Sequence, residues 1–265
     1  MPELPEVETT ARRLAPDLVG RTIAGVRLAW PRHTPDPAAL CALLPGRRVT
    51  RVGRRGKYVV IELDPADRTL LIHLRMSGRL SIVPAGTLPD PYAHTVLALD
   101  DGHELRFSDA RKFGQLTLPA DPEQILAKLG PEPLSPRFTA GWLAEALAAR
   151  RRAIKPLLLE QSFIAGLGNI YADEVLFRAG VDPRRPANSL AGGEVARLHS
   201  AIRQVLQEAI DHQGTSLDWV YPEGGMEARL QVYRRGGEPC VRCGTPIERI
   251  VLGQRGTHYC PSCQR

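Results

Sequence analysis

The sequence predicts a multidomain α+β protein: an antiparallel β-sandwich with flanking helices, then a helical domain, then a hairpin that carries cysteines. Three observations predict this order. Strand-like segments with alternating apolar residues fill residues 22–118, and short turns of Gly, Asp and Pro separate them. Helical apolar spacing replaces this alternation after Pro119. Four of the five cysteines lie between residues 240 and 263.

A first helix is expected over residues 6–14. Pro5 suits the first turn of a helix because its φ is already helical, and Pro16 is expected to end the helix. The expected strands follow in order at residues 22–30, 47–52, 58–63, 69–74, 79–83, 95–99, 104–108 and 115–118. A short helix at residues 37–44 interrupts them, and Cys41 on it is expected to be buried as a small apolar side chain.

The second half of the chain is expected to be mainly helical. The expected helices lie at residues 123–129, 140–149, 154–161, 172–179 and 193–212. Residues 130–133, with the sequence Gly-Pro-Glu-Pro, resemble a linker. The sequence therefore predicts a β-sandwich domain over residues 1–130, a helical domain over 131–225 and a metal-held segment over 226–265.

The clustered cysteines form two pairs with Cys-x-x-Cys spacing: Cys240, Cys243, Cys260 and Cys263. Each pair places two thiolates on one tight turn, and two such turns make a tetrahedral cage. Zinc is the expected occupant because soft sulfur ligands suit it, and four protein ligands leave no open position. One structural zinc ion is therefore expected, under a hairpin with strands at 247–252 and 257–259. Disulfides and free thiols are the alternatives, and His258 could compete for the metal.

The charge of the chain indicates a polyanionic partner, since the net charge is +6 and the isoelectric point is near 9.3. Residues 47–57 carry six basic residues and no acid, and residues 150–155 carry four and no acid. Residues 226–265 add seven Arg against three Glu. A solvated face is the alternative for any one run, but three separate clusters suit the long backbone of a DNA duplex.

No apolar run approaches the roughly 18 residues that a membrane helix needs, so no membrane association is expected. Six charged residues among the first twenty argue against a secretory signal. A reducing compartment fits both this start and a cage of thiolates, so we expect a cytoplasmic protein.

Three segments make the chain similar to a known family: the opening MPELPEVET, the motif GNIYADE at residues 168–174, and residues 231–263. Together they resemble the formamidopyrimidine-DNA glycosylase family from Pro2 to Cys263. The resemblance implies a sandwich, a helix-two-turns-helix domain and a zinc finger. It also implies an enzyme of base-excision repair that removes oxidised purines, such as 8-oxoguanine and formamidopyrimidines, and then nicks the strand by β,δ-elimination as an abasic-site lyase. The expected partner is double-stranded DNA with an oxidised base or an abasic site, bound by a nucleoid-associated monomer.

The resemblance implies four catalytic residues. After removal of Met1, Pro2 presents a secondary amine with a pKa near 8, so some of it is a neutral nucleophile at pH 7. Its attack on the sugar C1′ would give a Schiff base, and this iminium has no N–H to lose and stays an electron sink. Glu3 would protonate the sugar ring oxygen. Lys57 and Arg255 would hold phosphates and assist elimination. Without the resemblance, Pro2 would simply stiffen the terminus and Glu3 would favour the helix dipole.

An extruded base leaves a hole in the duplex that must be filled. Met76, Arg111 and Phe113 match the residues with which the family fills it, and apolar wedges that kink DNA are known. For Met76 alone, a place in the core is the alternative.

The resemblance also implies contacts to the DNA backbone. Asn169 follows Gly-Leu-Gly at the start of a helix, where amides can bind a phosphate, although a helix-terminating turn is the alternative. Arg150 and Lys155 would add contacts that position the duplex without reading sequence. Where close relatives carry a histidine contact, this chain has Tyr92, two residues before His94, and a tyrosine can still donate to phosphate.

Two other functions stay open at this stage. The sister endonuclease VIII branch prefers oxidised pyrimidines, but it tends to show Gly after Pro-Glu, where this chain has Leu4. A zinc-ribbon protein that binds nucleic acid without cleaving it is the other possibility. Residues 213–229, rich in Gly and Glu, are expected to form a loop over the flipped base.

Overall fold

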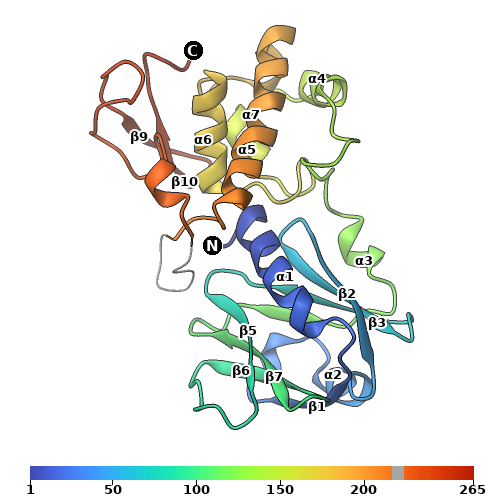
Figure 1. Ribbon diagram of the computed structural model, residues 1–265. Helices are drawn as coiled ribbons and strands as arrows, with labels where there is room; N and C mark the ends of the chain where they lie inside the picture. Colours follow the sequence, from blue (N-terminus) through green and yellow to red (C-terminus); the bar gives the residue numbers. More distant parts are fainter. Residues whose placement is uncertain (217–223) are drawn as a thin grey trace. The chain divides into compact units, whose positions relative to one another are not determined.

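The computed structural model describes residues 1–216 and 224–265, which form two compact units (Figure 1). The first unit contains Met1–Lys128, and the second contains residues 129–216 and 224–265. Part of the loop expected over the flipped base, residues 217–223, lies outside the described residues.

The first unit is built on two antiparallel sheets of four strands each. One sheet has the order β2 (Arg48–Arg55), β3 (Tyr58–Asp64), β4 (Thr69–His73) and β8 (Gln115–Thr117). The other has the order β1 (Ile23–Leu28), β6 (Ala93–Leu99), β7 (His103–Asp109) and β5 (Gly78–Pro84). Buried side chains from both sheets share one apolar core. The predicted antiparallel sandwich is confirmed, because two sheets that alternate apolar and polar residues must bury their apolar faces together.

Three α-helices and one 3-10 turn accompany the sandwich: α1 (Leu4–Leu18), α2 (Pro37–Leu43), α3 (Glu123–Leu126) and η1 (Pro31–His33). The expectation that Pro16 ends the first helix is wrong. Pro16 lies in the last turn of α1, where its missing N–H costs only one late hydrogen bond. Cys41 is exposed and not buried. Helix α2 turns Leu40 inward, with Leu44 just beyond its end, and this places the next residue after Leu40 on another face.

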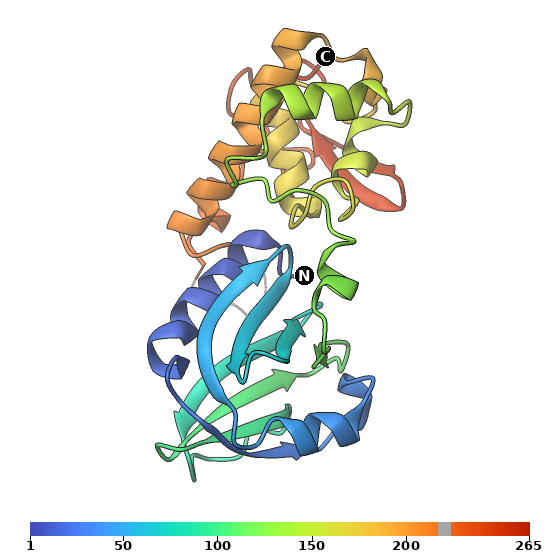
Figure 2. The ribbon, with the colours of Figure 1, turned by 90° about the vertical axis from the view of Figure 1, so that its right-hand side faces the viewer.

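The second unit contains four α-helices: α4 (Ala140–Ala148), α5 (Ile154–Leu158), α6 (Asn169–Ala179) and α7 (Gly192–Asp211). This unit also contains short 3-10 turns: η2 (Ala187–Ser189) lies between α6 and α7, and η3 (Glu227–Arg229) follows α7. Figures 1 and 2 show α6 beside α7, with the last strand of the chain next to α6. Almost every residue of α6 is buried, including Asp173 and Glu174. Both acids therefore need partners inside the protein.

The chain ends in an antiparallel hairpin of β9 (Glu248–Leu252) and β10 (Arg255–Tyr259). Gly253 and Gln254 join the strands with φ of +56° and +62°, as a two-residue turn with two positive φ angles requires. Phe177 of α6 packs in one apolar cluster with buried residues of this C-terminal segment. In the described part of the chain, no helix is long and apolar enough to cross a membrane.

Candidate active site, wedge loops and zinc centre

The four cysteines of the terminal segment come together as the spacing predicts. Their sulfur atoms all lie within 4.8 Å of one another. The Sγ–Sγ distance is 3.9 Å between Cys240 and Cys263 and 3.5 Å between Cys243 and Cys260. A zinc ion with four sulfurs at about 2.3 Å requires edges of about 3.8 Å, so the residues fit the metal.

His258 is not part of this cluster. Its ring Nδ1 faces Asp173 at 3.3 Å, and its backbone N–H donates to the same carboxylate at 2.9 Å. Within residues 1–216 and 224–265, no other group of three or more Cys, His, Asp or Glu is placed to hold a metal. The chain therefore has one structural zinc site, with the four cysteines as its ligands.

The start of α1 holds the N-terminal residues in place. Pro2 and Glu3 are buried, and Glu3 is the residue that precedes the first turn of the helix. The Glu6 carboxylate accepts the Glu3 backbone N–H at 2.8 Å. Because Pro2 is joined to this same peptide group, Glu6 also restricts where the proline ring can lie.

Lys57 follows Gly56 in the turn between β2 and β3 and is 6 % exposed. The His73 ring lies nearby, edge-on to Tyr58 with 4.8 Å between the ring centres, and its Nδ1 accepts the Arg75 N–H at 3.0 Å. Burial lowers the pKa of His73 to about 3, and the charges of Arg75 and Lys57 add to this effect. The imidazole is therefore neutral at physiological pH and does not compete with Lys57 for an anion.

Met76 and Phe113 are exposed apolar side chains, with exposed fractions of 42 % and 57 %. Met76 lies in the turn between β4 and β5, and Phe113 lies in the loop between β7 and β8 with Arg111. An Arg111 Nη1 atom contacts the Met76 sulfur at 3.6 Å. The alternative core position for Met76 is therefore wrong, and the loops bring two of the three predicted wedge residues into contact.

Half of the basic run at residues 47–57 is neutralised by acids from elsewhere in the first unit. Arg47 pairs with Asp67, Arg51 with Glu62 at 2.7 Å, and Arg54 with Glu8 at 2.9 Å. The structure therefore makes this run much less positive than the sequence suggests.

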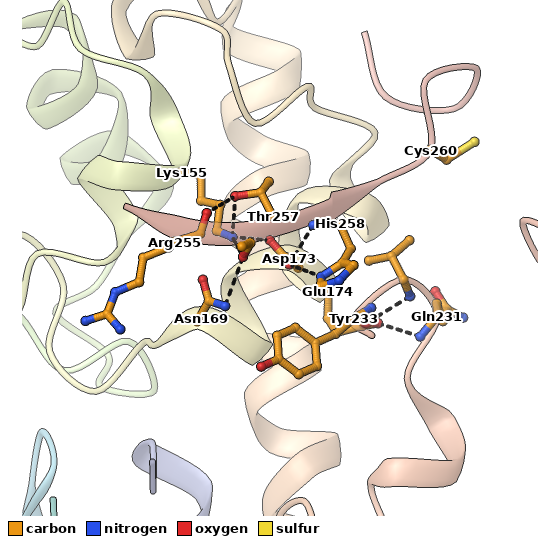
Figure 3. A network of polar contacts seen from close by, with 12 residues as sticks. Lys155, Asn169, Asp173, Glu174, Gln231, Tyr233, Arg255, Thr257, His258 and Cys260 are labelled. Atoms are coloured by element: carbon orange, nitrogen blue, oxygen red, sulfur yellow. Dashed lines mark hydrogen bonds and ion pairs between the residues drawn. The ribbon is translucent and has the colours of Figure 1, made fainter. Parts of the chain in front are cut away.

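Lys155 is not placed to contact DNA, which corrects the expectation from sequence. Its side chain is fully buried, and its Nζ lies 2.7 Å from Asp173 Oδ1 (Figure 3). The same Nζ donates to the Gly256 carbonyl at 2.9 Å and to the Thr257 hydroxyl at 2.8 Å. A lysine with three protein acceptors and no exposed surface cannot reach a phosphate, so its role is to tie α5 and α6 to the zinc hairpin.

Asn169 and Glu174 connect the start and the middle of α6 to the terminal segment. Asn169 Nδ2 donates to the Gly256 carbonyl at 3.0 Å, next to Arg255. Glu174 accepts the backbone N–H groups of residues 231, 232 and 233, each at 2.9 Å. Burial raises the pKa of Glu174, and these hydrogen bonds oppose the rise. Arg255 is exposed, and its side chain extends away from this network (Figure 3).

The remaining predicted DNA contacts lie on the surface. Tyr92 is 46 % exposed and precedes β6, and Arg150 is exposed just after α4.

Sequence reasoning gave no role to Asp173 or Glu174, although they belong to the quoted GNIYADE motif. The sequence feature that could have identified them is the pair of adjacent acids within an apolar helix, because a buried acid needs a specific partner.

We expect the second unit to be destabilised when only one partner of the buried Lys155–Asp173 pair is removed. Lys155→Met leaves the Asp173 carboxylate buried without its cation, which should cost about 3–5 kcal/mol in the free energy of unfolding. Adding Asp173→Asn should recover part of this loss, because the amide is neutral and can still accept the His258 N–H. Urea unfolding followed by circular dichroism measures both.

A matched control is Arg21→Met, which removes a partly exposed ion pair with Asp101 and should cost at most about 1 kcal/mol. Equal stability of Lys155→Met and wild type would contradict the role of the buried pair.

Comparison with known proteins agrees with this architecture along the chain. Family models match the formamidopyrimidine-DNA glycosylase N-terminal domain at residues 1–116, the H2TH domain of the same enzymes at 129–220, and a zinc finger found in FPG and IleRS at 237–265. This order of domains defines a DNA glycosylase of the helix-two-turns-helix class.

Two curated relatives are formamidopyrimidine-DNA glycosylases from Herpetosiphon aurantiacus and Geobacillus kaustophilus, each 48 % identical, with 100 % of both chains covered. Among solved structures, a Lactococcus lactis FPG mutant in complex with Fapy-dG-containing DNA has a TM-score of 0.93 and 37 % identity, with full coverage of both chains. The MutM (FPG) protein from Thermus thermophilus has a TM-score of 0.89 and 42 % identity, covering 99 % of this chain and 98 % of that one. The chain belongs to the formamidopyrimidine-DNA glycosylase family.

Proposed function

We propose that this protein excises oxidised purines, such as 8-oxoguanine and formamidopyrimidines, from double-stranded DNA and then cleaves the strand at the abasic site. The observation that carries the proposal is the similarity to glycosylases over the whole chain, including the Lactococcus lactis protein, whose structures are solved with Fapy-dG-containing DNA for a mutant and with DNA that contains an abasic site. The partner is damaged duplex DNA, bound by a monomer in the cytoplasm at the nucleoid.

In the proposed reaction, the amine of Pro2, freed by removal of Met1, attacks the sugar C1′ while Glu3 protonates the ring oxygen and the C1′–O4′ bond opens. The proline nitrogen gives up its proton and expels the damaged base by breaking the bond between the base and C1′, and the base leaves protonated. The iminium remains on C1′. Glu3 is buried at the start of α1, directly after Pro2 in the chain, and a carboxyl there can serve as the general acid of the ring-opening step. Glu6 holds the Glu3 peptide and so orients both groups. The iminium then acts as the electron sink for β,δ-elimination, in which Lys57 and Arg255 stabilise phosphate charge.

We propose a division of labour among the three predicted domains. Residues 1–130 supply the catalytic amine, the acid and the wedge residues. Residues 131–225 bind the DNA backbone through Arg150 and Asn169, and residues 226–265 present Arg255 on a hairpin that zinc holds in shape. The ion supplies no chemistry to the reaction, because four cysteines complete its coordination.

A paired assay tests the proposed specificity. Duplexes with a single 8-oxoguanine or a single thymine glycol are incubated with the protein under single-turnover conditions. Faster release of 8-oxoguanine supports the proposal, and faster release of thymine glycol indicates endonuclease VIII specificity. Binding to both without cleavage would indicate a zinc-ribbon protein that only binds nucleic acid.

Binding to undamaged duplex should depend strongly on salt, since each phosphate contact releases counterions. We expect Arg150→Gln to reduce the slope of log K against log salt by about one. Arg51→Gln is the matched control, because this exposed arginine is already paired with Glu62 at 2.7 Å, and its slope should equal that of wild type. Fluorescence anisotropy over a salt series measures the slopes, and an unchanged slope for Arg150→Gln would remove Arg150 from the footprint.

A further inference from the structure

One buried carboxylate joins two exposed loops of the sandwich. Asp109, the last residue of β7, is 0 % exposed. Its Oδ1 accepts the hydroxyl of Ser77, from the turn between β4 and β5, and the backbone N–H of Arg111 at 3.2 Å. Its Oδ2 accepts the backbone N–H of Gly114 at 2.6 Å. Both oxygens are therefore in use, and their three donors come from two different loops.

Each of these donors lies at or beside a predicted wedge residue. Ser77 follows Met76 directly, Arg111 belongs to the wedge set itself, and Gly114 follows Phe113. The Arg111 N–H also donates to the Ser77 hydroxyl oxygen at 3.2 Å, which closes the contact between the loops. The position of every wedge residue is thus linked to the same carboxylate.

The backbone of these loops is held in a conformation that it would not keep without support. Arg75 and Lys112, each next to a wedge residue, have φ of +54° and +59°. Residues with side chains stay in this left-handed region only where their surroundings hold them, and such residues cluster at functional sites. The Lys112 ammonium lies 4.3 Å from the centre of the Trp30 ring and anchors the middle of its loop.

Both loops also lie tightly against one aromatic ring. A Cβ atom added at Gly114 would lie 2.3 Å from the Phe107 ring, and one added at Gly78 would lie 2.9 Å from it. The loops therefore have no space in which to shift toward the core while the carboxylate holds them.

We propose that Asp109, assisted by Ser77, is a positioning residue for base extrusion: it holds Met76, Arg111 and Phe113 ready to enter the duplex. The proposal rests on the proposed glycosylase function. If the two loops were mobile, their exposed apolar side chains would lose conformational entropy on entering DNA. Loops that are already held in place avoid much of this entropic cost.

Asp109→Asn tests the proposal, because an amide has one acceptor oxygen where the carboxylate uses two. Its N–H₂ group must then face a donor from one of the loops. We expect single-turnover excision of 8-oxoguanine from duplex DNA to fall roughly tenfold, and the fluorescence change of a 2-aminopurine beside the lesion to slow similarly. Nicking of a single-stranded oligonucleotide with an abasic site should change less than about twofold, because there is no opposite strand and no hole to fill.

Two further variants complete the test. Ser77→Ala removes the hydroxyl that donates to Asp109 and accepts the Arg111 N–H, while the bonds from the Arg111 and Gly114 N–H groups to Asp109 remain. It should therefore show the same pattern with a smaller loss, and it carries the test if Asp109→Asn does not fold. Asp36→Asn, which alters the cap of α2 where Asp36 accepts the Ala39 N–H at 2.9 Å, is the control and should match wild type on both substrates.

Equal losses on the duplex and the single strand would overturn the proposal, because they would show a purely structural role. Unchanged duplex excision by both loop variants would overturn it as well. The proposed function fails in a different way, since wild type itself would then release no 8-oxoguanine. If wild type is active and Met76→Ala and Phe113→Ala keep the full 2-aminopurine signal, the wedge assignment is wrong and this proposal falls with it.

Discussion

A protein with a short peptide fused ahead of Pro2 is expected to bind lesion DNA normally and yet to lose base excision by about a thousandfold or more. The fusion converts the proline amine into an amide, whose nitrogen lone pair is delocalised into the carbonyl and cannot attack C1′. Borohydride added during the reaction should trap wild type on DNA by reducing the iminium, and it should trap none of the blocked protein. Gel assays of nicking and of the covalent complex measure both results.

Glu3→Gln is the informative comparison for this experiment. Its amide cannot protonate the sugar ring, so release of 8-oxoguanine should collapse. An abasic site has already lost its base and its sugar opens spontaneously, so this variant should still trap and nick such DNA to some degree. Full excision by the N-terminally blocked protein would instead exclude Pro2 and make Lys57 the candidate for the Schiff base.

Disruption of the zinc cage is expected to have the second large effect. Metal binding at a four-cysteine site supplies folding energy for its segment, so Cys243→Ser should unfold the hairpin that carries Arg255. We expect DNA affinity and turnover to fall together, each by at least about tenfold. Cys41→Ser is the matched control, because Cys41 is exposed and lies outside the cage.

Replacement of zinc by cobalt separates a structural role from a catalytic one. Cobalt accepts the same tetrahedral sulfur ligands, so rates should stay within about twofold of the zinc protein, while the thiolate-to-cobalt absorption reports that the site is filled. A large change in rate at unchanged DNA affinity would contradict the structural role of the metal.

The strands and the cage were predictable because their signals are local. Alternation of apolar residues between turn residues places β3 and β7 within a residue or so of their observed limits. The Cys-x-x-Cys spacing predicts the four ligands because each pair is made within one turn. The end of α1 was missed, since packing against the sandwich keeps the helix intact beyond Pro16.

The polar interior was not predictable, because it depends on partners that are far apart in the sequence. Lys155 belongs to a basic run, and only the fold places Asp173 beside it. The charges of Arg51 and Arg54 are likewise offset by acids on another strand and on α1. Asp109 has no sequence signal at all, because its function depends on two loops that meet only when both sheets have formed.

The two-residue turn at Gly253 and Gln254 limits how this hairpin can change during evolution. Side chains alternate between the faces of a strand, so inserting or deleting one residue before Arg255 would turn its guanidinium to the opposite face. Thr257, two residues further along, would turn with it and lose its contact with Lys155. The identity of the exposed turn residues can therefore drift within the limits of positive φ, but the length of the turn cannot. We expect relatives that keep this arginine to keep the same number of residues between their two Cys-x-x-Cys pairs, or to differ only where compensating changes restore the alternation.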